Sequence, residues 1–130
     1  MKLLQVGQDF SIFRLAAQEN PLTGPVNYTG FVGQNFTFDC SSPLKNCVGI
    51  NWYKKTEGRD RDTIFSGNNG IYLRDKYTVG KSTEGCRLTV KNVDFNDKGS
   101  VSCEILISHR SFTGTAALIV RSKFRPIILQ

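Results

Sequence analysis

The stretch that decides the fold is "DKGSVSCEI", Asp97–Ile105, which carries the last of four cysteines in a chain of 130 residues. Val101, Cys103 and Ile105 alternate with polar residues, and this period of two predicts a strand with one face in a core and one in water. Similar short segments, separated by Gly, Asn, Asp, Ser and Pro, recur along the chain. Many short strands with turn signals between them predict an all-β sandwich or barrel.

The composition is typical of a single soluble globular domain, with 39% hydrophobic and 22% charged residues. The apolar runs are far shorter than the about 20 residues that cross a bilayer, and the first residues lack a signal-peptide core. We therefore expect the native signal and any membrane anchor to lie outside this sequence. The net charge is +6, but charges of both signs alternate, as in Glu57–Asp62. This pattern predicts a solvated surface and no nucleic-acid partner.

The four cysteines, at positions 40, 47, 86 and 103, are the main constraint on the chain. None of them forms a C-x-x-C pair, and the only histidine is His109, so we expect no zinc site or other metal. An even number of cysteines in a small β-rich chain instead predicts two disulfides and an oxidising, extracellular compartment. Sequence alone leaves three pairings open.

Trp52 follows Cys40 by 12 residues (52 − 40), and Cys103 follows Cys40 by 63 (103 − 40). This spacing resembles the Cys…Trp…Cys pattern of immunoglobulin domains. The segments "GQNFTFDC", "INWYKK", "RLTVKNVDFNDKGSVSC" and "FTGTAALIV" resemble strands B, C, E–F and G of variable-type domains. The chain is thus similar to V-set members of the immunoglobulin superfamily, which implies an immunoglobulin-like sandwich of two antiparallel Greek-key sheets. We place this domain at residues 25–121, after an N-terminal extension (1–24) and before a linker (122–130) toward a following domain.

The resemblance implies a role for several buried residues. Cys40–Cys103 would join the two sheets beside Trp52, and Cys47–Cys86 would clamp one end of the sandwich. We expect Leu88 and Val101 in the core. Lys54 lies on the same side of its strand as Trp52, and we expect it at the strand's solvated end.

The chain departs from the family at two positions. Val101 replaces the tyrosine whose hydroxyl normally holds the loop before strand F, so about 1 kcal/mol must come from elsewhere. Thr113 replaces the first glycine of the strand-G bulge. By the same resemblance, Asp97 would pair with a basic residue at strand D, here Lys76. We also expect an edge strand at Phe10–Leu15.

We find no pattern of catalytic or cofactor-binding residues. His109 has no serine or cysteine partner at a recognisable spacing, and the glycine-rich "SGNNGIY" lacks the Lys-Ser/Thr of a phosphate-binding loop. We therefore expect neither an enzyme nor a cofactor. Two sequons, at Asn27 and Asn35, predict glycosylation, which agrees with an extracellular chain. In the V-set frame we expect both to lie away from the sheet of strands G, F, C, C′ and C″.

The resemblance implies the membrane-distal ectodomain of a cell-surface recognition or adhesion receptor, such as an invertebrate allorecognition receptor or a lancelet V-type protein. It would bind another immunoglobulin domain, or a second copy of itself, through that sheet. The expected contact residues are Asn51, Tyr53, Lys55, Ile64, Glu104, Leu106, Ser108, His109, Arg110 and Phe112. Tyrosine, leucine and phenylalanine would form an apolar centre within a polar rim.

Two alternatives remain. The first is an immune-type domain that binds antigen, a microbial or a soluble ligand through its loops, Ser41–Val48, Ser66–Gly70 and Ser108–Gly114. A disulfide-clamped first loop would lower the entropy cost of such binding. The second is a cytokine or ligand receptor module, in which basic side chains meet an acidic ligand.

Overall fold

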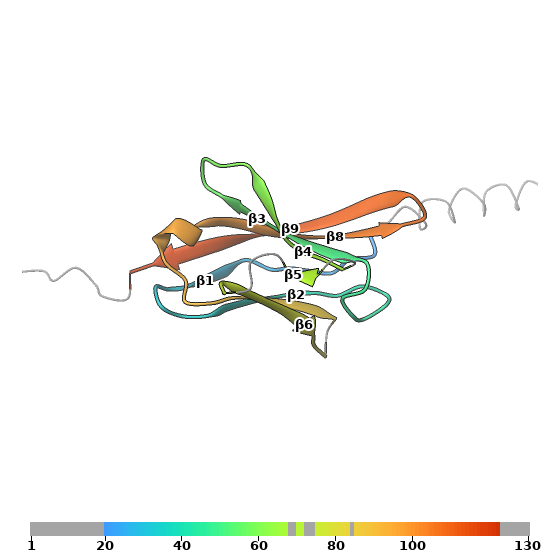
Figure 1. Ribbon diagram of the computed structural model, residues 1–130, viewed down its shortest axis with the longest axis horizontal. Coiled ribbons are helices and arrows are strands. Elements are labelled where there is room, and N and C mark those ends of the chain that lie inside the picture. The colour runs from blue at the N-terminus through green and yellow to red at the C-terminus, as the bar shows by residue number, and fades with distance from the viewer. Residues whose placement is uncertain (1–19, 68–69, 72–74, 84, 123–130) are drawn as a thin grey trace, which may run out of the picture.

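The computed structural model describes residues 20–67, 70–71, 75–83 and 85–122, and within them the chain folds into two stacked β-layers (Figure 1). One short 3-10 helix, η1 (Phe95–Asp97), precedes β8, and these described residues contain no α-helix. The strands are β1 (Tyr28–Phe31), β2 (Phe36–Cys40), β3 (Ile50–Thr56), β4 (Arg61–Ser66), β5 (Gly70–Ile71), β6 (Tyr77–Lys81), β7 (Cys86–Val90), β8 (Gly99–Ile107) and β9 (Arg110–Arg121). The all-β sandwich predicted from the sequence is confirmed.

The two layers are a six-stranded sheet, in the order β1-β9-β8-β3-β4-β5, and a three-stranded sheet, β2-β7-β6. Neighbouring strands are antiparallel except β1 and β9, which pair in parallel at one edge of the larger sheet. The chain first forms an antiparallel bridge between Thr23 and Ser41, beside β2, and then crosses to β9. This crossing places β1 beside the last strand and in the same direction.

The core between the layers contains the residues that the sequence placed there. Trp52, Leu88 and Val101 are completely buried. Both expected disulfides are present: Cys40–Cys103, with a Cα–Cα distance of 6.5 Å, and Cys47–Cys86, with 4.8 Å. Trp52 is the Cα partner of Cys103 in the β3–β8 pairing, and its indole N–H donates a hydrogen bond to Cys86 Sγ at 3.4 Å. The single tryptophan therefore connects the surroundings of both disulfides.

The loop before β8 is held by the carboxylates of Asp94 and Asp97. Asp97 accepts a hydrogen bond from the Asp94 backbone N–H at 2.8 Å, and Asp94 in turn accepts from the Asn96 N–H at 2.8 Å. This reciprocal arrangement is a capping box around η1. The expected ion pair is also present, with Lys76 Nζ 2.7 Å from Asp97 Oδ2. These contacts anchor the loop before β8.

Lys54 is a correction to the sequence interpretation. It points inward as expected, but its residue is only 3% exposed and does not lie at a solvated strand end. The pairing of β3 with β8 continues beyond it, through Lys55 and Ser100 to Thr56 and Gly99, so the sheet still covers it. Its ammonium group donates to the Lys55 carbonyl and to Thr56 Oγ1, both at 3.4 Å.

Three other expectations concern the ends of the chain. The edge strand at Phe10–Leu15 lies outside the described residues, as do most of the extension (1–24) and of the linker (122–130).

The strand-G bulge, in which Thr113 replaces the first glycine, does not form among the described pairs. Instead, β9 pairs with β8 without a register shift from Arg110 to Leu118.

Candidate functional site

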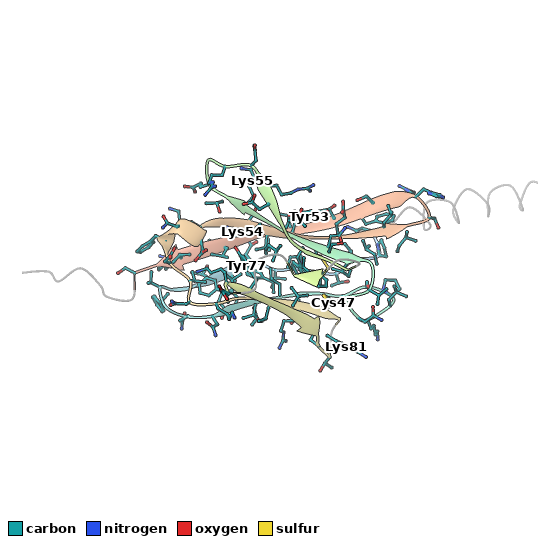
Figure 2. The ribbon with its side chains drawn as sticks, viewed as in Figure 1. Cys47, Tyr53, Lys54, Lys55, Tyr77 and Lys81 are labelled. Carbon is teal, nitrogen blue, oxygen red and sulfur yellow. A yellow bond between two sulfur atoms is a disulfide. The ribbon has the colours of Figure 1, made fainter. Side chains whose placement is uncertain are left out.

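The outward face of the six-stranded sheet brings together most of the predicted contact residues. Asn51, Tyr53 and Lys55 alternate along β3 with inward residues, and β8 pairs beside it with Asn51 opposite Glu104. Leu106 lies two residues beyond Glu104 on the same face. Figure 2 labels Tyr53 and Lys55 on this layer, above the three-stranded sheet that carries Lys81.

A hydrogen-bonded network centred on Glu104 covers the middle of this face. Glu104 Oε1 accepts from the Tyr53 hydroxyl at 2.6 Å and from the Asn51 amide at 3.2 Å. Glu104 Oε2 accepts from the Ser111 hydroxyl at 2.7 Å. The guanidinium carbon of Arg61 lies 3.8 Å from the centroid of the Tyr53 ring. Sequence reasoning missed Arg61 and Ser111, because their position on this face depends on strand register.

The network favours the ionised form of Glu104 and the neutral form of Tyr53. The hydrogen bond from Tyr53 is the largest cause that lowers the pKa of Glu104, with further contributions from Ser111 and Asn51. Burial is the largest cause that raises the pKa of Tyr53, and the Glu104 carboxylate raises it further. The Glu104 carboxylate therefore accepts a hydrogen bond from the neutral Tyr53 phenol. Such a charge-assisted hydrogen bond is stronger than one between two neutral groups.

The apolar centre predicted for this face is smaller than expected. Tyr53 is only 9% exposed, because it is enclosed by the contacts with Glu104 and Arg61, whereas Leu106 is 66% exposed. Phe112 points the other way: it pairs with the buried Ile105 and packs against the core. Leu106 is thus the exposed apolar side chain among the predicted aromatic and aliphatic contacts.

Ile64 is a second correction, since it is completely buried and belongs to the core. The β3–β4 pairing shifts register between Trp52 and Tyr53, so Trp52 pairs with Phe65 while Tyr53 pairs with Thr63. A bulge of this kind inserts one extra residue into a strand and changes the direction of its neighbours. Before this shift, Arg61 and Thr63 lie opposite the outward Lys55 and Tyr53, so alternation along β4 places Ile64 inward, and its assignment to the contact face is wrong.

The predicted loop Ser108–Gly114 is mostly strand. Only Ser108 and His109 separate β8 from β9, with φ angles of 50° and 65°. A two-residue turn with positive φ at both positions matches the twist of a hairpin, although Asn and Gly are the usual residues there. Ser108, His109 and Arg110 are exposed at this turn, and the Arg110 guanidinium carbon lies 5.3 Å from the Phe112 ring centroid.

Both sequon asparagines are exposed, and their side-chain oxygens accept backbone hydrogen bonds. Asn27 Oδ1 accepts from the Ala117 N–H and Asn35 Oδ1 from the Asn92 N–H, each at 2.9 Å. Asn35 immediately precedes β2, in the smaller sheet. Asn27 precedes β1 and contacts β9, so it lies at the edge of the six-stranded sheet. The sequence had suggested a position away from that sheet. Glycosylation itself stays a prediction.

The described part of the chain contains no cluster of three or more His, Cys, Asp or Glu residues that could hold a metal ion. Within the same residues, no helix has the length and apolar character that a membrane span needs. No protein-family model matches the chain, and no curated protein is significantly similar to it. The two disulfides indicate an oxidising compartment, as is usual for secreted and extracellular proteins.

Proposed function

We propose that the chain is a V-set immunoglobulin domain that recognises another protein at the cell surface. The strand order, the inter-sheet Cys40–Cys103 disulfide beside Trp52, and the Lys76–Asp97 ion pair support this assignment. The partner is another immunoglobulin domain or a second copy of this chain. It binds the outward face of the six-stranded sheet.

One observation carries the proposal: an exposed leucine lies beside a preorganised polar network on a sheet face that no other described element covers. Leu106 is 66% exposed, and Glu104 fixes the side chains of Tyr53, Asn51 and Ser111. Side chains that are already ordered lose little conformational entropy on binding. An apolar contact within a ring of ordered polar groups is the usual organisation of a protein interface.

The experiment compares Leu106→Glu with Val26→Glu in sedimentation velocity over a range of concentrations. Both residues are exposed aliphatics, at 66% and 77%, but Val26 precedes β1 and lies outside the Glu104 network. If the chain binds its own copy, the wild type and Val26→Glu dimerise as concentration rises, while Leu106→Glu stays monomeric.

A second arm of the experiment covers the case in which the partner is a different protein. Wild-type and variant chains, as tetramers on a fluorescent carrier, are tested against cells that display a library of immunoglobulin ectodomains. Binding that Leu106→Glu abolishes and Val26→Glu preserves supports the proposal. Equal behaviour of the two variants in both arms, or no association in either, contradicts it.

The structure also favours a second candidate function at the loop end. Ser108 and His109 form a tight turn in the left-handed region, a conformation that costs free energy and often occurs at functional sites. The loop clamped by Cys47–Cys86 exposes Leu44 at 56% and Val48 at 61%. If this end binds an antigen or a microbial ligand, Lys45→Glu and Arg110→Glu weaken binding while Leu106→Glu does not.

A further inference from the structure

The six-stranded sheet has an open strand edge at the end opposite the Ser108–His109 turn. The pairing of β8 with β9 ends at Gly99 and Leu118, but β9 continues through Ile119 and Val120 to Arg121. These last residues pair with β1 on one side only. An extended strand with one unpaired side is a template for another strand.

A hollow of about 440 Å³ lies along this open edge, and Glu57, Lys98 and Ile119 are among the residues that line it. A neighbouring hollow of about 530 Å³ also includes Glu57 and Lys98, together with Arg59 and Phe95. Figure 1 shows the hairpin between β3 and β4, which carries Glu57 and Arg59, rising away from the two layers. The Glu57 N–H donates to the Lys98 carbonyl at 3.2 Å, so this hairpin is joined to the loop before β8.

The residues around the two hollows combine positive charge with exposed apolar surface. Arg59, Lys98 and Arg121 carry three positive charges against the single negative charge of Glu57. The two ion pairs among the described residues, Lys76–Asp97 and Arg87–Asp39, involve none of them. Phe95 is 54% exposed and Ile119 is 38% exposed.

We propose that this edge binds an extended acidic peptide segment of another protein as an added strand. The peptide backbone pairs with β9 beyond Leu118, as in other cases of strand addition to a sheet edge. Acidic side chains of the peptide approach Lys98 and Arg59, and apolar ones contact Phe95 and Ile119. This site goes beyond the proposed function, because it uses neither Leu106 nor the Glu104 network.

Charge argues against the chain's own tail as the occupant. Residues 123–130, "KFRPIILQ", contain Lys123 and Arg125 and no acidic side chain. A basic segment is repelled where cations outnumber carboxylates, whereas an acidic segment is attracted. An acidic partner also suits a chain with a net charge of +6.

The test selects short random displayed peptides on the full chain and measures the affinity of the enriched ones by fluorescence polarisation. We expect enriched peptides to be rich in Asp and Glu with apolar residues between them. Their dissociation constant should rise about tenfold for Lys98→Glu and stay unchanged for Leu106→Glu. Backbone amide signals of Ile119–Arg121 should shift on binding in NMR spectra of the wild type.

The proposal fails if no peptides are enriched or if the enriched peptides lack acidic residues. It also fails if Lys98→Glu leaves the affinity unchanged or if the amide shifts are confined to other strands. Displacement of the acidic peptide by a synthetic peptide of residues 123–130 would instead identify the tail as the occupant. A dimer lost in Lys98→Glu and insensitive to the acidic peptide would identify a second copy. Since both variants replace exposed residues, unchanged thermal unfolding serves as the folding control.

Discussion

The Cys47–Cys86 disulfide gives the sharpest prediction of stability, because the chain topology sets its magnitude. This bridge closes a loop of 39 residues, which in isolation corresponds to about 4 kcal/mol of chain entropy. However, it lies within the loop closed by Cys40–Cys103. That first bridge already connects Cys47 and Cys86 through a shorter path, with seven residues from Cys40 to Cys47 and 17 from Cys86 to Cys103, or 24 in all.

The two paths between Cys47 and Cys86 act in parallel in the unfolded chain. A path of 39 and a path of 24 residues behave as one loop of about 15, so the second bridge is worth about 3 kcal/mol. Replacing both cysteines by alanine also removes the sulfur that accepts from the Trp52 N–H, and an unpaired buried donor costs about 1 kcal/mol or more. We therefore expect Cys47→Ala/Cys86→Ala to lose about 4 kcal/mol.

The assay is equilibrium urea unfolding of the oxidised proteins, followed by the fluorescence of Trp52. A second variant, Cys47→Ala/Cys86→Ser, keeps a hydroxyl acceptor for the indole and isolates the cross-link from the hydrogen bond. It should recover about 1 kcal/mol. Peptide mapping must first show that Cys40–Cys103 is intact in both variants. A loss below about 1 kcal/mol, with an unchanged urea dependence, would refute the chain-entropy argument.

Three further changes test polar groups that are buried or half-buried. Burial raises the pKa of Tyr77 to about 12, with smaller contributions from Asp97 and Asp62, so the neutral phenol stabilises the fold below pH 10. This stability, about 2–3 kcal/mol, is lost between about pH 10 and 12, and Tyr77→Phe should remove that loss in pH-dependent urea unfolding. Burial lowers the pKa of Lys54, so the cost of its buried ammonium is present below the lowered pKa and is relieved as pH rises from there toward about 10.4. Lys54→Met should abolish this rise in stability at alkaline pH. It should not destabilise the protein at pH 7, since apolar replacement of a buried charge is often neutral or stabilising. A large loss of unfolding free energy at pH 7 would show that the ammonium is essential. The pKa of Glu104 is lowered, so the stability from its network is present above about pH 4.3 and is lost as pH falls through the lowered pKa. Glu104→Gln should flatten this loss of stability at acid pH. The same acid transition in Glu104→Gln and in the wild type would contradict the network.

The alternation of residues predicted the central strands, and the resemblance to V-set domains added the pairing of the cysteines, which the sequence alone left open. Cys40 lies in β2, which pairs with β7 without a register shift, and Trp52 and Cys103 lie in β3 and β8, which pair with each other without one. Alternation therefore predicts the direction of these three side chains correctly. The same regularity placed Asn51 and Glu104 on the outward face. Here local sequence and tertiary register agree.

Ile64 and Phe112 were assigned to the contact face by the resemblance, although alternation along their own strands places both inward. Ile64 is in phase with Asp62, the partner of the inward Lys54, and Phe112 is in phase with the buried Ala116 and Leu118. The turn residues Ser108 and His109 give no Asn-Gly signal that would have identified this hairpin. Lys54 is buried because β8 continues beside its strand to Gly99, a length that its own segment does not encode.

The two proposed surfaces lie far apart on one sheet and should act independently. Leu106 pairs with Ser111, and Ile119 lies eight residues further along β9 (119 − 111), or about 26 Å at the rise of a strand. Sites at this separation with no shared side chains have additive effects on binding free energy. A Leu106→Glu/Lys98→Glu variant should therefore show each single defect unchanged. Coupling between them would mean that one partner spans the whole face, which would merge the two sites into a single interface.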